Sequence, residues 1–551
     1  MLKILNILSL FSLTKLLISF FIYSAGISLL VQFLILPVFL PQFHIGNGLL
    51  DGGDWTFYHK RAVELSSQIE TFGWSIWQIR PQGFGMIGFS SAVYSLTGIY
   101  EPYVLIPFFS ILHSLGAISI VLLIEKLGVG RGVSIISSIP FLVFPSSLLW
   151  VTQILKDIFT INGSLIIILA LISIVSITQR DNINIFFKKL LILYILAIFG
   201  FILIWIVRPY FIQITLIFVI IFFLITNFFF IFQILKKKLS IFYLISILLT
   251  QIVLILSIIN LPKLDKEEIN ENSLLAEIPS PVIDESKIAI NKIDFESNIN
   301  KTNDNFIKSE INNTNNTNKT NNTNNTNNNN IKTNDNFIKT EINNNKNNTN
   351  KANDNFFKTE INNNTNKNND ECCIDSKIEK KKIITFNDWS YTPYLPTLFD
   401  NEFKKLYMQR IYFYSIQHSA NSTFDIDIEL NSFKKLVGYA PRAIQVGFLS
   451  PFPSSWFTEY PSQLSNLMHI ISGFEMLFIY ICLTGFAYSM FIWKKKLEFW
   501  MLICFSFYFT LIPTYAIPNT GSLIRYRYGA LMLLVAIGIS AFLKRYKRHL
   551  K

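Results

Sequence analysis

Leu49-Leu50-Asp51-Gly52-Gly53-Asp54-Trp55-Thr56-Phe57-Tyr58-His59-Lys60 follows the first long apolar run of the chain and places two acidic residues beside it. That run, from Leu16 to Leu40, is long enough to cross a bilayer. Lys3 and Lys15 precede it, so we expect a signal anchor with the N-terminus in the cytoplasm. The stretch 49–60 then begins the first loop on the opposite side of the membrane.

The composition indicates a polytopic membrane protein. Of the 551 residues, 51% are hydrophobic and 51 are Phe, more apolar surface than a soluble domain needs. The net charge is +12, but the Lys and Arg residues cluster beside apolar runs, which is a topology signal. This placement argues against nucleic acid as a partner. The sequence therefore predicts an all-α protein of about ten transmembrane helices.

The positive-inside rule fixes the predicted topology. The apolar segment 84–98 is too short to cross a bilayer of ordinary thickness. If it lies along the membrane as a juxtamembrane helix, every large basic cluster faces the cytoplasm, and so do both termini. We therefore expect a multi-pass protein, in a bacterial inner membrane, with further spans near 102–124, 132–150, 158–178, 187–207, 211–234, 240–261, 464–492, 497–517 and 525–543.

Four regions follow from this topology. Residues 1–261 form an N-terminal membrane module, and 464–551 form a C-terminal membrane segment. Residues 262–382 are rich in Asn, Lys and Thr, a composition that cannot bury enough apolar surface to fold, so we expect disorder there. Residues 383–463 contain many aromatic residues with Pro and Gly between them, which predicts a small ordered extracytoplasmic lobe.

Ionisable residues near a membrane are costly, so each is a candidate for function. Asp51 and Asp54 lie in the first outer loop, where Asp54 could also be a simple N-cap for a helix near 57–70. Asp157 is a second acid at the outer surface. Basic residues at outer span ends oppose the positive-inside bias, and arginine forks match phosphate oxygens. The further candidates for an anion site are Tyr58, Arg80, Lys156, Arg208, Arg442, Arg525 and Arg527.

The first part of the chain resembles the GT-C glycosyltransferases, which include protein O-mannosyltransferases, aminoarabinose transferases and glycosyltransferase family 39. The stretch Asp54-Trp-Thr-Phe-Tyr58-His-Lys-Arg-Ala62 is similar to their first outer loop, and Arg80-Pro81-Gln82-Gly83-Phe84 to their juxtamembrane segment. Glu125-Lys126-Leu127-Gly128 is similar to their cytoplasmic turn, and Asp157 matches an acid in their second outer loop. Gln82 departs from the family, where Pro is common. The resemblance covers roughly residues 15–210.

This resemblance implies transfer of a sugar from a polyprenyl-phosphate donor to a glycan or lipid acceptor of the envelope. Asp54 would take the proton of the acceptor hydroxyl, with Asp51 as the fallback. The arginines would stabilise the departing lipid phosphate. Asp157 could orient the acceptor or help to bind a divalent cation, Mg or Mn. Membrane lipids are the remaining expected partner.

Two other functions stay open. A polysaccharide polymerase or ligase would depend on Arg442, Arg525 and Arg527 and would not need Asp54. A transporter of lipid-linked glycans would need ionisable residues in mid-span or an internal repeat of the spans. Glu475 is the main mid-span charge, and no inverted repeat is visible.

Overall fold

The structure is a computed structural model that describes residues 2–176, 183–236, 240–262, 387–417, 422–459 and 462–549. All of these belong to one compact unit, formed by residues 1–270 and 385–551. The predicted disordered insert lies outside the described residues, apart from its first residue, Pro262.

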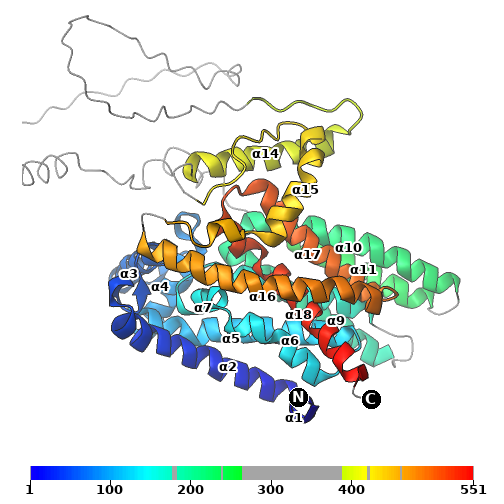
Figure 1. Ribbon diagram of the computed structural model, residues 1–551, viewed down its shortest axis with the longest axis horizontal. Coiled ribbons are helices and arrows are strands. Elements are labelled where there is room, and N and C mark those ends of the chain that lie inside the picture. Colours follow the sequence, from blue (N-terminus) through cyan, green and yellow to red (C-terminus); the bar gives the residue numbers. More distant parts are fainter. Residues whose placement is uncertain are drawn as a thin grey trace, which may run out of the picture. The chain divides into compact units, whose positions relative to one another are not determined.

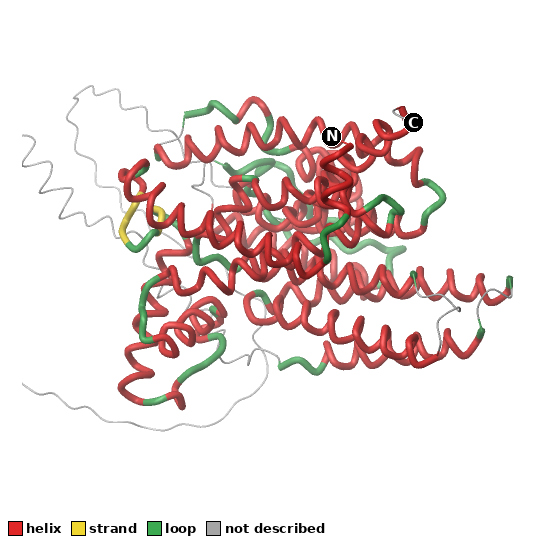
Figure 2. Tube along the Cα trace, turned by 90° about the horizontal axis from the view of Figure 1, so that it is seen from below, coloured by secondary structure: helices red, strands yellow, loops and turns green. Residues whose placement is uncertain are grey.

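Helices make up nearly all of the described structure, and one short hairpin lies at one end of the bundle (Figure 2). Nine described helices are long and apolar enough to cross a membrane, and the number rises to ten if one bent pair counts as a single span. This confirms the prediction of an all-α, multi-pass membrane protein. The helices that pass this test are α2 with η1 (Leu13–Leu30, Val31–Phe39), η5 with α5 (Pro102–Leu105, Ile106–Lys126), α8 (Asp157–Val175), α9 (Ile183–Val207), α10 (Pro209–Leu235), α11 (Ile241–Ile259), α16 (Gln463–Trp493), α17 (Leu497–Ala516) and α18 (Thr520–His549).

The helices α8 and α18 are the most buried of these spans. α8 packs against α5 and α9, and α18 packs against α16 and α17. Close approach of backbones makes this possible, as is common between membrane helices. A side-chain carbon at Gly163 would lie 2.7 Å from the Gly200 carbonyl oxygen, and one at Gly538 only 2.1 Å from the Cys482 carbonyl oxygen.

The predicted span 132–150 is not one straight helix, which corrects the sequence-based expectation. It consists of α6 (Arg131–Val143) and α7 (Pro145–Thr152), bent by 65°. Phe144, between them, has extended backbone angles, as the residue before a proline prefers. The bend turns α7 away from the axis of α6 and leaves its first N–H groups without helical partners.

Side chains from other helices satisfy both ends of α7. Glu475 accepts hydrogen bonds from the backbone N–H of Ser146 (2.7 Å) and from its hydroxyl (2.5 Å). At the other end, Gln32 donates its amide N–H to the Thr152 carbonyl oxygen at 2.6 Å. Because hydrocarbon offers no hydrogen bonds, these contacts allow a broken helix at membrane depth.

The first loop forms a small layer at one end of the bundle (Figure 1). It contains β1 (His44–Gly46) paired antiparallel with β2 (Leu49–Leu50), then α3 (Asp54–Phe72) and α4 (Gly85–Thr97), with short turns of 3-10 helix at Pro41–Phe43, Trp74–Ile76 and Pro81–Gly83. α4 has 13 residues. It packs against α3 and against the end of α9. The short helix predicted at 84–98 therefore lies beside the spans' ends.

The predicted lobe has its own hydrophobic cluster. It contains α14 (Thr397–Gln417) and α15 (Phe433–Leu449), followed by a 3-10 turn at Pro453–Ser455. Trp389, Tyr407, Leu436 and Tyr439 are buried together and contact Tyr515 of α17. The segment before α18 is tied to the lobe as well, because Thr423 and Asn519 form an antiparallel bridge.

Both ends of the chain lie at the same end of the bundle. α1 (Leu2–Ser9) contributes Leu5 to a cluster with Val133 and Leu543. Basic residues gather at this end too: the Lys496 amine donates to the Lys126 carbonyl oxygen at 3.4 Å. The acids of the first loop are at the opposite ends of the spans.

Loss of the Glu475 carboxylate should destabilise the bundle. Glu475→Leu leaves the Ser146 N–H and hydroxyl unpaired, which costs about 1–3 kcal/mol per group. We expect a clear fall in the melting temperature of the purified protein in detergent. Phe474→Leu, on the adjacent exposed position, is the control and should melt like the wild type. An unchanged melting temperature for Glu475→Leu would contradict this account of α7.

Candidate functional site

Two ion pairs join segments that are far apart in the sequence. Arg525, near the start of α18, donates from both terminal nitrogens to Asp54 Oδ2, at 2.9 and 3.3 Å. Arg208, between α9 and α10, donates to Asp157 Oδ1 at 2.8 Å. The first loop, the start of α8, the junction of α9 with α10 and the start of α18 therefore carry these charges.

The two pairs differ sharply in burial. The Asp157 and Arg208 side chains are 0% and 1% exposed, whereas those of Asp54 and Arg525 are 44% and 24% exposed. The Arg208 guanidinium also lies over the Tyr526 ring, 4.2 Å from its centre, and the Tyr526 hydroxyl is hydrogen-bonded to that of Tyr210 at 2.5 Å. The Asp157–Arg208 pair, which we call the inner pair, is buried by protein. The Asp54–Arg525 pair, which we call the outer pair, can be reached from solvent.

Lys156 and Tyr58 lie within the electrostatic reach of both pairs. Burial, reinforced by the charge of Arg208, lowers the pKa of Lys156 to about 8, while Asp54 and Asp157 oppose the shift. Burial and the nearby Asp54 carboxylate raise the pKa of Tyr58 above its ordinary value. Six of the predicted site residues thus form one group, which we call the outer cluster: Asp54, Tyr58, Lys156, Asp157, Arg208 and Arg525.

The local structure of α3 explains how Asp54 is presented. Gly53 is the N-cap of α3 and Asp54 is the first residue of the helix. A side chain at Gly53 would collide with the Trp55 ring, only 2.5 Å away. The alternative that Asp54 serves as a simple N-cap is therefore wrong, and its carboxylate is directed to Arg525 instead.

The other predicted site residues lie elsewhere or have other partners. Asp51 is exposed in the turn before α3, and Arg80 stacks on Trp205 with 4.3 Å to the ring centre. Arg442 forms a two-pronged ion pair with Asp425 in the lobe. The fully buried Arg527 donates to three backbone carbonyl oxygens at the C-terminal end of α15, those of Val446, Gly447 and Ser450.

Sequence reasoning missed Gln153, which is 0% exposed and lies three residues before Lys156. Its side-chain oxygen accepts the Leu50 N–H at 3.1 Å, and its amide donates to the Gly48 carbonyl oxygen at 3.2 Å. The available signal was an amide within the segment 148–155, where every other residue except Thr152 is apolar.

The outer cluster does not suit a divalent cation. Within the described ranges, no three His, Cys, Asp or Glu side chains come together as possible metal ligands. Asp157 already holds Arg208, and three cationic side chains lie around the two carboxylates. Like charges would repel an added cation. The expected role of Asp157 with Mg or Mn therefore does not fit, and no chemical step is assigned to a metal.

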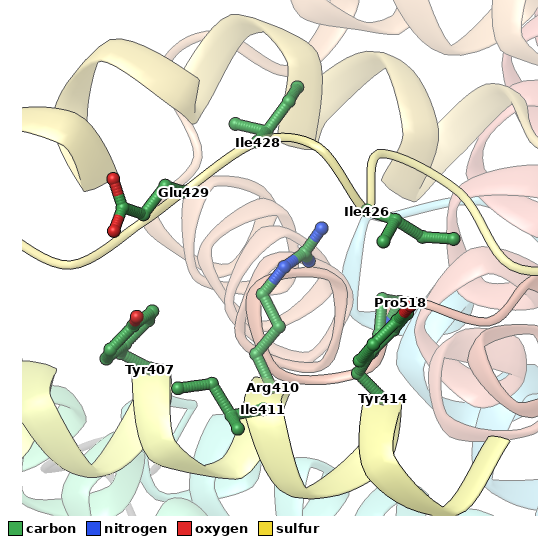
Figure 3. Close-up of a pocket in the computed structure, with 8 residues that line it drawn as sticks. All are labelled: Tyr407, Arg410, Ile411, Tyr414, Ile426, Ile428, Glu429 and Pro518. Carbon is green, nitrogen blue, oxygen red and sulfur yellow. The ribbon is translucent and has the colours of Figure 1, made fainter. Parts of the chain in front are cut away.

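A separate pocket lies in the lobe (Figure 3). Arg410 extends into it, with Tyr407 and Glu429 on one side and Tyr414 and Pro518 on the other. The Arg410 guanidinium donates to the Asp425 and Tyr515 carbonyl oxygens, at 2.9 and 3.4 Å. These bonds give Arg410 a structural role in joining the lobe to the end of α17.

Each charge of the inner pair should mainly offset the cost of burying the other, so that the pair as a whole adds little to the stability of the protein. Asp157→Leu alone leaves a buried, uncompensated Arg208, which costs about 3–5 kcal/mol. We expect the double variant Asp157→Leu/Arg208→Met to be more stable than either single variant. Denaturation of the purified protein in detergent measures this.

The control for this cycle is the exposed pair Arg61–Glu64 on α3. Its single and double variants should each change stability by less than about 1 kcal/mol. Simple additivity of the two buried substitutions would show that Asp157 and Arg208 do not depend on each other.

Comparisons of the chain with protein-family models, with curated proteins and with solved structures found no match. The geometry and chemistry of the outer cluster therefore carry the functional argument.

Proposed function

We propose that the chain is an integral membrane glycosyltransferase of the GT-C type. It moves a sugar from a polyprenyl-phosphate donor to an envelope or exopolysaccharide acceptor at the outer face of the membrane. The observation that carries the proposal is the reachable Asp54–Arg525 pair, together with the buried Asp157–Arg208 pair and Lys156, whose amine feels the charges of both pairs.

The proposed reaction needs a base and an anion site next to each other. Asp54 accepts the proton of the acceptor hydroxyl as that oxygen attacks the anomeric carbon. The bond between the anomeric carbon and the donor phosphate oxygen breaks, and the charge passes to the lipid phosphate. Arg525 and Lys156 stabilise that charge, because guanidinium and ammonium groups form strong hydrogen bonds with phosphate.

The remaining residues of the outer cluster support these groups. The Asp157 carboxylate neutralises Arg208, so that the sealed pair adds little net charge. The Tyr58 side chain is buried one helical turn after Asp54, and the Asp54 charge acts on its hydroxyl. Asp51, exposed in the preceding turn, has no part in this proposal.

The proposed orientation places the outer cluster outside the bacterial inner membrane and both termini in the cytoplasm. Two observations support it: the termini lie at one end of the bundle, and Lys126 and Lys496 meet at that end. Basic residues are enriched at cytoplasmic span ends.

The rival functions find less support in the geometry. Of the three arginines that a polymerase would use, Arg442 is paired with Asp425 and Arg527 with backbone carbonyls, and only Arg525 lies in the reachable pair. A transporter is favoured by the broken α6–α7 span and by Glu475. Both oxygens of Glu475, however, are occupied by Ser146.

Replacement of the base should abolish the reaction. In Asp54→Asn, the side chain keeps its size but cannot take a proton, and we expect sugar transfer to fall by a factor of about 10²–10⁴. The assay is transfer from radiolabelled polyprenyl-phosphate sugars by membranes that contain equal amounts of inserted protein. Asp51→Asn is the matched control and should retain transfer. Wild-type transfer by Asp54→Asn would refute the proposal.

Donor binding should weaken as pH rises through about 8. Lys156 has a lowered pKa of about 8, so its positive charge is present below that pH and is lost above it. We expect the donor KM to rise by about tenfold or more as this charged contact disappears. Lys156→Arg keeps the charge, because guanidinium stays protonated, and should move the rise to higher pH. A donor KM that is flat across this range in the wild type would exclude Lys156 from the anion site.

A further inference from the structure

The backbone of Leu50 connects the two loops that carry Asp54 and Lys156. Its N–H donates to the side chain of Gln153, and its carbonyl oxygen accepts the indole N–H of Trp55 at 2.6 Å. Trp55 follows Asp54 directly, and Gln153 precedes Lys156 by three residues. A short covalent segment leads from Trp55 to Asp54, and another leads from Gln153 to Lys156 and Asp157. The Leu50 backbone is hydrogen-bonded to the first residue of each segment.

Burial makes this connection stiff. Gln153 is fully buried, and Leu50 and Trp55 are each 6% exposed. A buried hydrogen bond cannot be exchanged for one with water, so its loss leaves an unpaired polar group. The Gln153 amide makes two such bonds with the hairpin, to Leu50 and to Gly48.

A second glutamine, Gln32 of the first span, contacts both the α7–α8 linker and the hairpin. Gln32 donates to the carbonyl oxygen of Thr152, the residue before Gln153, and its own side chain packs on Gly48. A side-chain carbon at Gly48 would lie 2.6 Å from that of Gln32, and Gly48 also has a positive φ of 71°. The hairpin thus has no room to slide along the α7–α8 linker.

We propose that Gln153 is a positioning residue: by holding the backbone of Leu50, it fixes Asp54 relative to Lys156 and Asp157. Its catalytic meaning rests on the proposed function, but the positioning itself can be measured without any activity. Displacement of a reacting group by about 1 Å can cost a factor of 10² in rate.

Lys156 provides the readout. Burial is the main cause of its lowered pKa, and the charges of Arg208, Asp54, Asp157 and Arg525 also act on its amine. When the hairpin loosens, water reaches the amine and its pKa returns toward the ordinary value for lysine. Acetylation with an N-hydroxysuccinimide ester across a pH series, followed by mass spectrometry, reports the midpoint for Lys156, with the exposed Lys60 as internal reference.

The two variants break the connection from opposite sides. Gln153→Met keeps the length of the side chain and removes both hydrogen bonds, and Trp55→Phe keeps an aromatic ring and removes the bond to the Leu50 carbonyl. We expect both to raise the acetylation midpoint of Lys156 from about 8 by about one pH unit or more. Gln251→Met is the matched control: Gln251 is also buried, but it is bonded to Asn227 of α10 and should leave the midpoint unchanged.

Transfer assays on the same variants complete the test. We expect kcat to fall by about 10- to 100-fold in Gln153→Met, with a smaller change in donor KM, and to stay at the wild-type level in Gln251→Met. A wild-type midpoint for Lys156 in both Gln153→Met and Trp55→Phe would overturn the inference. If the two variants shift the acetylation midpoint of Lys156 but the wild-type protein itself transfers no sugar, the positioning role is upheld and the proposed function is refuted.

Discussion

Backbone N–H and C=O groups in hydrocarbon must be hydrogen-bonded. At the break between α6 and α7, helices from distant parts of the chain provide the partners. The Ser146 N–H finds Glu475 from α16, and the Thr152 carbonyl finds Gln32 from the first span. Helices from both halves of the chain are therefore needed to complete one short helix. The direction of α7 places Gln153 and Lys156, which follow it, at the end of the bundle where the first loop lies. A straight span could not make this turn before the start of α8.

The electrostatics of the outer cluster follow from its two levels of burial. Ions that are removed from water need a close partner, and Asp157 and Arg208 supply that partner to each other. The outer pair, Asp54 and Arg525, keeps contact with solvent, so its mutual attraction is screened. A weakly held pair can exchange its partner for an incoming anion at low cost. The buried pair Asp157–Arg208 is held in place by its partners, and the reachable pair Asp54–Arg525 is the one that the proposed reaction uses.

The sequence predicted the parts of this arrangement that depend on local signals. Apolar runs gave the spans, and the short run at 84–98 predicted a helix beside the membrane rather than through it. The break at Phe144 was also readable, because Pro145 disfavours a helical residue before it, yet the apolar run hid it. Asp54 was a candidate because of its position after the first span, and the structure places it in the ion pair with Arg525, not at the N-cap of α3.

Other features depend on tertiary contacts and could not be read from the chain. Asp54 and Arg525 are separated by 471 positions, and nothing local marks Arg525 as the partner in preference to Arg527. Only packing shows that Arg527 is sealed against the end of α15, where its charge meets the negative end of the helix dipole. Gln153 was inconspicuous for the same reason, since its two partners are backbone groups.

The start of α18 joins the lobe to the outer cluster. Arg527 holds the end of α15, and the backbone of Thr520 donates to the Ser422 carbonyl oxygen at 3.0 Å. Arg525 and Tyr526, on the same turn of helix, reach Asp54 and Arg208. A shift of the lobe against the bundle would therefore move the start of α18, and with it the partner of the proposed base. Because α15 and Asp54 are joined through this one helical turn, a displacement of α15 would move Arg525 relative to Asp54.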